Sequence, residues 1–214
     1  MNKTLIITGG AIDYEVLINA YKNGKFNNVI AVDKGLEAVE KLNIVPNLII
    51  GDFDSVNKKI LERYEKQGIK IVKLNSEKDF SDTHMALKSA IELKSEYVCI
   101  VGALGNRMDH AIANIHVLKE MLDNKIRCII LDKNNEIELI SKGISEVEKS
   151  IYKYVSLFPL TTKTTGITLE GFKYPLKNAT LEIGHSIGVS NEIIDNIGKI
   201  KIKKGILILM KSKD

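Results

Sequence analysis

Two carboxylates stand one residue apart directly after a short apolar run. Asp52 and Asp54 lie in the sequence Gly-Asp-Phe-Asp-Ser at positions 51–55, and positions 47–50 read Asn-Leu-Ile-Ile. Such a run is typical of a buried parallel strand, and open α/β sheets bind ligands at the carboxyl ends of their strands. Neighbouring carboxylates repel unless a cation lies between them, and their hard oxygens suit Mg²⁺ bound together with substrate phosphates. The motif therefore predicts a magnesium site.

The same residues also have a purely structural interpretation. They could form an Asx-rich turn in which Asp54 or Ser55 caps the following helix. Short motifs match by accident, so the choice depends on which other residues share that edge of the sheet.

Further acidic residues follow other apolar runs in the first 132 residues. If those runs are parallel strands, their carboxyl ends line one edge, which would hold Asp33, Asp52, Asp54, Asp79, Asp82 and Asp109. So many uncompensated carboxylates would cost several kcal/mol in a partly dry cleft. A divalent ion, or the side chains of Lys78 and Arg107, must offset that charge. Asp79, Ser81 and Asp82 could also include a helix cap, although one cap needs only one of them.

A glycine-containing segment follows the run at 97–101. Gly102 and Gly105 could let backbone N–H groups approach a phosphate at a helix N-terminus, or could simply shape a strand-to-helix turn. Arg107, just before that helix, is placed for bidentate phosphate binding.

The elements that must position these residues alternate along residues 1–132. We predict strands at 3–8, 28–32, 47–50, 69–74, 97–101 and 126–131. We predict helices at 13–22, 36–42, 57–67, 81–94 and 109–122, with Asp13 as the cap of the first. This alternation predicts an α/β N-terminal domain with a mostly parallel, Rossmann-like sheet.

Residues 133–214 show a different pattern, without a long helical period. Short β-branched runs occur at 137–140, 152–160, 166–172, 180–183, 192–194, 199–203 and 206–210. The run at 199–203 alternates strictly between Lys and Ile, which predicts one buried face, and Lys204 and Gly205 read as a turn. We predict a smaller all-β C-terminal domain, a sandwich or a partial barrel.

Composition excludes several classes of protein. The chain has 214 residues, 44% hydrophobic and 27% charged, with a net charge of +4. This is ordinary for a globular protein, and no basic run is interleaved with aromatic residues, so we expect no nucleic acid partner. No apolar stretch approaches the ~20 residues needed to span a membrane. Cys99 and Cys128 lie in apolar runs and read as buried hydrophobes, and without a signal peptide pattern we expect a cytoplasmic protein.

The combined pattern resembles the thiamine pyrophosphokinase family. Asp33 and the segments 51–55, 78–82 and 102–110 match that family in order and spacing, and 171–176 and 186–192 are similar to its thiamine-binding part. The resemblance covers nearly the whole chain. It implies an ATP- and Mg²⁺-binding catalytic domain at 1–132, and a thiamine-binding and dimerisation domain at 133–214. It also implies a homodimer with the active site near the subunit interface.

The resemblance further implies transfer of pyrophosphate from ATP to the thiamine hydroxyl, which gives thiamine diphosphate and AMP. Its position-by-position implications fall into three groups. Asp52, Asp54 and Asp82 would hold Mg²⁺ and act in catalysis with Asp109 and Arg107. The nucleotide would be bound by Asp33, Lys78, Asp79, Gly102, Gly105 and Arg107. Thiamine would be bound by Ser186, Ser190 and Asn191.

The chain departs from the family at one point. Family members can place an aromatic residue, sometimes Trp, against the thiamine ring, but this sequence has no Trp. Tyr174 or Phe172 could stack there instead. Two other functions stay open from the residues alone: a metal-dependent nucleotide-sugar transferase, and a sensor that binds a nucleotide or thiamine diphosphate without turnover.

Overall fold

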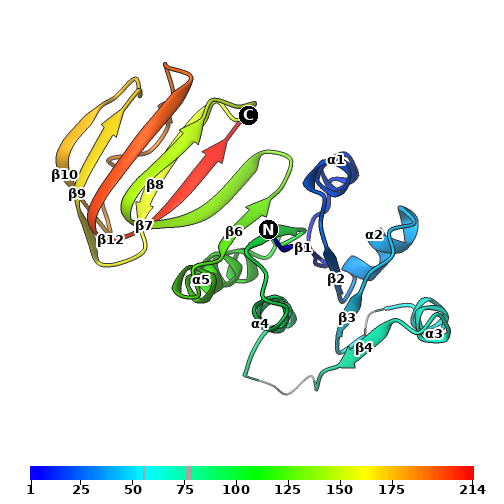
Figure 1. The fold of residues 1–214 in the computed structure, drawn as a ribbon. Helices are drawn as coiled ribbons and strands as arrows, with labels where there is room; N and C mark the ends of the chain where they lie inside the picture. Colours follow the sequence, from blue (N-terminus) through cyan, green and yellow to red (C-terminus); the bar gives the residue numbers. More distant parts are fainter. Residues whose placement is uncertain (55, 76–78) are drawn as a thin grey trace. The chain divides into compact units, whose positions relative to one another are not determined.

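The chain folds into two compact units, Met1–Lys133 and Asn134–Asp214. The structure is a computed structural model that describes residues 1–54, 56–75 and 79–214 (Figure 1). The boundary predicted after residue 132 differs from this division by one residue. No helix in these ranges is long and apolar enough to cross a membrane.

Among its described residues, unit 1 contains six strands joined in parallel, in the order β6-β5-β1-β2-β3-β4. The strands are β1 (Lys3–Ile7), β2 (Asn28–Val32), β3 (Leu48–Gly51), β4 (Lys70–Lys73), β5 (Tyr97–Val101) and β6 (Arg127–Leu131). The helices are α1 (Tyr14–Gly24), α2 (Gly35–Lys41), α3 (Lys58–Lys66), α4 (Asp82–Glu92) and α5 (Met108–Asp123). The sequence predicted each of these elements with ends within two residues of those observed.

Helix caps explain where several helices begin. Asp13 caps α1, as predicted, because its side chain accepts hydrogen bonds from the amides of Glu15 and Val16. Asn57 caps α3 by accepting from the Lys59 amide. The alternative in which Asp54 caps this helix is therefore wrong, and Ser55 lies outside the described residues.

The core of unit 1 explains why its strands read as continuous apolar runs. Leu5, Ile6 and Ile7 of β1 are all completely buried, although successive side chains of a strand point to opposite faces. Leu5 and Ile7 pack in one cluster with Leu17 of α1 and Leu36 of α2. The opposite face is covered by α4, which contacts β2 and β3, and by α5, which contacts β6. Helices thus cover both faces of this sheet, as parallel sheets require.

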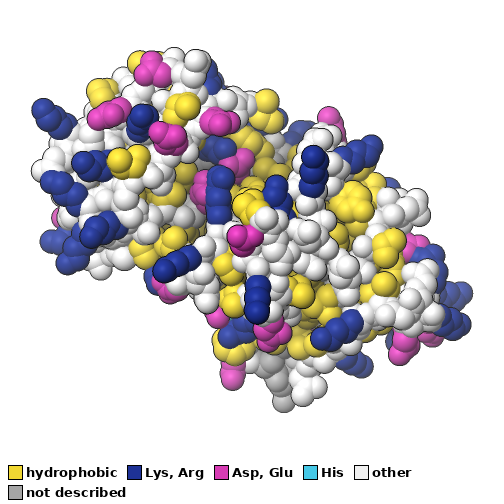
Figure 2. Space-filling view, viewed as in Figure 1, with side chains coloured by type: hydrophobic (Ala, Val, Ile, Leu, Met, Phe, Trp, Pro, Cys, Tyr) yellow, Lys and Arg dark blue, Asp and Glu magenta, His cyan; other side chains and the backbone are white. Residues whose placement is uncertain are grey.

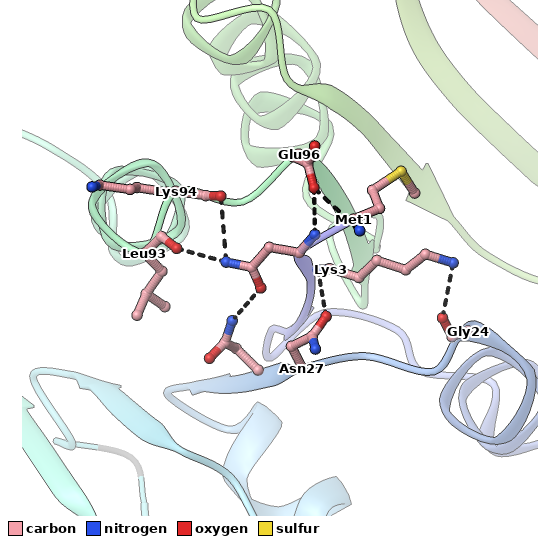
Figure 3. A network of polar contacts seen from close by, with 9 residues as sticks. Met1, Lys3, Gly24, Asn27, Leu93, Lys94 and Glu96 are labelled. Carbon is pink, nitrogen blue, oxygen red and sulfur yellow. Dashed lines mark hydrogen bonds and ion pairs between the residues drawn. The ribbon is translucent and has the colours of Figure 1, made fainter.

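The amino ends of the strands in unit 1 are closed by a polar network (Figure 3). The amide N–H of Asn2 donates to Glu96 at 2.6 Å, and its side-chain amide donates to the carbonyl oxygen of Leu93 at 2.7 Å. The amide of Lys3 donates to Asn27 at 2.9 Å. These bonds tie the start of β1 to the segments that follow α1 and α4. At this end of the sheet these polar groups form hydrogen bonds with one another.

Unit 2 is built from strands. They are β7 (Asn135–Glu148), β8 (Tyr154–Pro159), β9 (Lys163–Glu170), β10 (Leu176–Glu182), β11 (Asn191–Glu192) and β12 (Ile197–Ser212). β12 pairs with β7 along its whole length, and its other edge pairs first with β9 and then with β8. Every pairing among these strands is antiparallel.

A bend inside β12 corrects one prediction. Lys204 and Gly205 do not form a turn between two strands, because β12 continues through them. The register against β7 shifts between Ile202 and Ile206, and Gly205 has a φ of 106°. Only glycine adopts this backbone conformation readily, so the residue that suggested a turn instead bends one long strand.

The core of unit 2 follows the predicted alternation. Ile200 and Ile202 are 0% and 2% exposed, whereas Lys199 and Lys201 are exposed. The buried isoleucines pack in one cluster with Leu157 of β8 and Leu209 at the other end of β12. Both halves of β12 therefore contribute to a single core. On the molecular face in Figure 2, basic and acidic side chains are interspersed around apolar ones.

Substitution of Ile200 tests the packing of unit 2. Ile200→Ala should lower the free energy of unfolding by about 2–5 kcal/mol, because it removes a fully buried side chain and leaves a cavity. Urea unfolding followed by circular dichroism measures the change. The matched control is Lys201→Ala on the exposed face. It should change the free energy of unfolding by no more than about 0.5 kcal/mol. Equal effects of the two substitutions would contradict the assigned alternation.

Candidate active site

A cleft of about 950 Å³ lies at the carboxyl ends of the strands of unit 1. Its walls come from the loops after β1, β2, β3 and β5, from the first turn of α4 and from the first two turns of α5. Parallel pairing brings these segments together although they lie up to about a hundred residues apart in the sequence. The edge is the one at which the sequence predicted a ligand site.

The structure gathers most of the predicted residues of unit 1 at this cleft. Those that line it are Asp33, Asp52, Asp82, Gly102, Gly105, Arg107 and Asp109. Asp54 and Asp79 are not among the lining residues, and Lys78 lies outside the described residues. The acidic edge therefore forms with four carboxylates at the cleft instead of the six expected.

Asp33 is held in an unusual backbone conformation at the end of β2. Its φ is 47°, and its amide donates to the carbonyl oxygen of Ile50 at 3.0 Å. A Cβ atom at Gly51 would collide with Asp33 Oδ1, so the glycine at the start of the acidic motif makes space for this carboxylate. Left-handed conformations of residues other than glycine cluster at functional sites, which fits a role for Asp33 in the cleft.

Asp52 fits both interpretations of its motif, the structural turn and the ligand site. Its Oδ1 accepts a hydrogen bond from the Asp54 amide at 3.0 Å, which is the predicted Asx turn. Phe53 between them has a φ of 63°, and Asp52 still lines the cleft. The turn therefore positions one carboxylate of the motif at the cleft but not the other.

The start of α4 presents Asp82. Ser81 is the N-cap, since its hydroxyl accepts from the His84 amide at 3.2 Å, so neither Asp79 nor Asp82 is needed as a cap. Asp82 occupies the first turn, where the helix dipole favours an anionic side chain. His84 Nε2 lies 2.5 Å from Glu120 Oε2 and so joins α4 to α5. This hydrogen bond from His84 is the main reason that the pKa of Glu120 is lowered.

Arg107 and Asp109 form an exposed ion pair at the start of α5. The guanidinium donates from Nη2 to Oδ2 at 2.5 Å and from Nε to Oδ1 at 3.2 Å. This pairing lowers the pKa of Asp109 and raises the pKa of Arg107. Asp109 therefore stays ionised to lower pH than an ordinary aspartate. Arg107 keeps its charge at the cleft, where it could exchange Asp109 for a phosphate.

The donor set at the cleft fits a divalent cation. Asp52 and Asp82 bring two hard-oxygen donors to one cleft, and Mg²⁺ commonly uses one or two carboxylates together with substrate phosphates. Across the described ranges, no three Asp, Glu, His or Cys side chains are grouped closely enough to hold a metal by themselves. A cation bound here would therefore complete its coordination with a phosphorylated ligand and water.

The predicted residues of unit 2 lie around one turn and strand β11. Ser186 and Ser190 are exposed, whereas Asn191 is only 5% exposed. The side-chain amide of Asn191 donates to the carbonyl oxygen of Tyr174 at 2.8 Å and accepts from the Tyr174 amide at 3.0 Å. Asn191 thus fixes the backbone that carries Tyr174, which is 59% exposed, while Phe172 is buried in the core.

Several cleft residues received no functional assignment from the sequence. Thr8, Gly10, Lys34 and Asn114 all line the cleft. Thr8 and Gly10 lie at the end of the first predicted strand, and Lys34 lies just after the second. Their position at strand ends could therefore have indicated that these three residues belong to the cleft. Asn114 lies within a helix, and its contact with the loop after β5 was not visible in the sequence.

These features define an α/β unit with an acidic cleft at the carboxyl edge of its parallel sheet, the edge at which open α/β sheets bind ligands. Comparison with known families extends this result. The family model of the thiamin pyrophosphokinase catalytic domain matches residues 22–130, and that of the thiamin pyrophosphokinase vitamin B1 binding domain matches residues 144–207. The chain belongs to the thiamine pyrophosphokinase family.

Individual relatives support this assignment along both units. Thiamine pyrophosphokinase from Bacillus subtilis (strain 168) is 36% identical over 186 residues, which cover 86% of this chain and 87% of the relative. The crystal structure of the Bacillus subtilis protein has a TM-score of 0.89 and 31% identity, with both chains fully covered. That of Geobacillus thermodenitrificans thiamin pyrophosphokinase has a TM-score of 0.87 and 27% identity, and covers 99% of this chain and 98% of that one.

The ion pair at α5 gives a titration that can be measured. Arg107→Ala should raise the pKa of Asp109 toward the ordinary aspartate range, because the hydrogen bond from Arg107 is the main cause that lowers it. A ¹³C NMR titration of the side-chain carboxyl of Asp109 measures this shift. Lys119→Ala removes a cation that pairs with Asp123 on the same helix and should leave Asp109 unaffected. An unchanged Asp109 midpoint in Arg107→Ala would show that the pair does not form.

Proposed function

We propose that this protein transfers the pyrophosphoryl group of ATP to the hydroxyl of thiamine, giving thiamine diphosphate and AMP. The observation that carries the proposal is the convergence of carboxylates, Arg107 and a glycine-containing loop at one cleft of the catalytic unit. The family models matched along both units, one catalytic and one for vitamin B1 binding, supply the substrate. Phosphoryl transfer depends mainly on positioning and charge neutralisation, which this set of residues can provide.

Each group of predicted site residues in the sequence of unit 1 has a proposed role. Asp52 and Asp82, with Asp54 from the same motif, hold Mg²⁺, which when bound neutralises charge on the phosphates. Arg107 and Asp109 act at the reacting phosphates, where Arg107 supplies a permanent positive charge. The remaining proposed nucleotide-binding residues are Asp33, Lys78, Asp79, Gly102 and Gly105.

Thiamine binding is assigned to unit 2. Ser186 and Ser190 offer exposed hydroxyl groups, and Asn191 acts by holding the segment that carries Tyr174. With Phe172 buried, Tyr174 is the better of the two aromatic candidates for stacking on the thiamine ring. Asn191 stays a proposed thiamine-binding residue, and its two hydrogen bonds to Tyr174 give it a supporting role as well.

We also propose a homodimer with the active site near the subunit interface. Exposed apolar side chains on unit 2 support an interface there, namely Tyr174, Ile183, Ile187 and Ile194.

A cytoplasmic location accords with the use of ATP and with two buried thiols, Cys99 and Cys128. The finer fold class proposed is Rossmann-like for unit 1 and a sandwich for unit 2. Parallel pairing of six strands and the two successive partners of β12 support these descriptions.

The reaction can be tested directly with purified protein. Incubation with thiamine, ATP and Mg²⁺ should produce AMP and thiamine diphosphate in equal amounts, as measured by chromatography. EDTA should abolish both products, and added Mg²⁺ should restore them. Formation of ADP, or absence of thiamine diphosphate while ATP is bound, would reject the proposed reaction.

Variants of the acidic residues test the metal site. Asp52→Asn and Asp82→Asn should each lower kcat by about a hundredfold or more, because a metal supplies several kcal/mol of charge stabilisation and 1.36 kcal/mol corresponds to tenfold. Asp54→Asn tests whether the second carboxylate of the motif joins the metal during turnover. Asp123→Asn, at the far end of α5, is the matched control and should retain activity. Near-normal kcat in Asp52→Asn or Asp82→Asn would remove that carboxylate from the metal site.

A further inference from the structure

The loop after β5 is held in place by hydrogen bonds that its carbonyl groups accept. The Gly102 carbonyl oxygen accepts from Thr8 Oγ1 at 2.5 Å and from the Gly10 amide at 2.9 Å. The carbonyl oxygen of Ala103 accepts from Asn114 Nδ2 at 2.7 Å, and that of Leu104 accepts from the Ala11 amide at 2.9 Å. Three successive carbonyl groups are thus engaged, two by the loop after β1 and one by α5.

This arrangement sets the direction of the following amide groups. In a planar trans peptide, the C=O of one residue and the N–H of the next point in opposite directions. The N–H groups of Ala103, Leu104 and Gly105 therefore point away from the donors that hold the carbonyls. These residues line the cleft, and within the described residues no acceptor binds these three amides. Backbone N–H groups that line a cleft and lack a protein acceptor can donate hydrogen bonds to an anionic ligand.

The two side chains in this arrangement are buried. Thr8 is 4% exposed and Asn114 is 8% exposed, which is uncommon for polar residues unless they are hydrogen-bonded. They approach the loop from different elements, Thr8 from the end of β1 and Asn114 from the second turn of α5. Each hydrogen bond therefore restrains one peptide group of the loop.

We propose that Thr8 and Asn114 are positioning residues for the triphosphate of the nucleotide. They hold the carbonyl groups of Gly102 and Ala103 away from the bound ligand and so keep the next amides available to its phosphate oxygens. Neither side chain needs to touch the ligand. This inference rests on the proposed function only for the identity of the ligand, because the geometry of the loop belongs to the protein alone.

Isosteric variants separate positioning from folding. Thr8→Val keeps the shape of the side chain but removes the hydroxyl, whereas Thr8→Ser keeps the hydroxyl. Calorimetric titration with α,β-methylene-ATP and Mg²⁺ should give a Kd about tenfold higher in Thr8→Val, the change expected for losing one hydrogen bond that orders the site. Thr8→Ser should bind as the wild type does. Asn114→Leu, which removes the other donor at similar volume, should weaken binding to a similar extent.

The same strand supplies a matched control. Thr4 at the other end of β1 is also fully buried, and its hydroxyl lies 2.7 Å from that of Ser95. Thr4→Val should lower the melting temperature as much as Thr8→Val but leave the Kd for the analogue unchanged. Equal weakening of binding by both variants would mean a general loss of stability, and would overturn the positioning role. Wild-type affinity in a folded Thr8→Val protein would overturn it as well.

Turnover assays distinguish this inference from the proposed reaction. In Thr8→Val, the KM for ATP should rise about tenfold while the KM for thiamine stays unchanged. If the wild type binds the analogue but forms no thiamine diphosphate, the proposed reaction fails, and the calorimetric comparison still decides the role of Thr8. If the wild type does not bind the analogue at all, there is no triphosphate to position and the inference is rejected.

Discussion

The hydrogen-bonded junction between the loops after β1 and β5 is the constraint on which the cleft depends. β1 and β5 are neighbours in the parallel sheet, so their loops leave the same edge side by side. A Cβ atom at Gly10 would collide with the carbonyl oxygens of Gly102 and Leu104, so the junction closes only because position 10 has no side chain. Ala103, Leu104, Gly105 and the start of α5 then lie at the cleft. Carboxylates that follow the neighbouring strands line the same cleft.

The two edges of the sheet in unit 1 show how polar groups are divided between stability and function. At the amino ends, Asn2 alone bonds to Glu96, Leu93 and Lys94, and the Thr4 hydroxyl pairs with Ser95. At the carboxyl ends, by contrast, acidic side chains from four segments share a cleft with Arg107. Mutual repulsion among these carboxylates favours a bound cation, and such a cation can in turn bind phosphate. At one edge of the same parallel sheet the polar groups are hydrogen-bonded within the protein. At the other edge a bound cation would reduce the repulsion between carboxylates.

Unit 2 uses buried polar groups for a related purpose. Asn191 is almost fully buried, yet it holds the backbone at Tyr174 through both of its amide atoms, and Ser156 accepts from the Ser190 amide at 3.0 Å. An amide side chain that bonds to backbone on both sides fixes a loop more firmly than apolar packing alone. The exposed hydroxyl and phenol groups nearby are therefore presented on a supported surface. This segment lies within the residues matched by the vitamin B1 binding model, 144–207.

The sequence by itself determined the order and type of the elements in unit 1, the alternation around Ile200, and the edge at which Asp33, Asp52 and Asp82 meet. These follow from local periodicity and from the rule that parallel strands align their carboxyl ends. Only the tertiary structure decided that Gly205 bends a strand instead of ending it, and that Asn114 supports the loop after β5. Each of these depends on a partner distant in sequence, and local pattern carries no information about which distant group fills a turn or accepts a hydrogen bond.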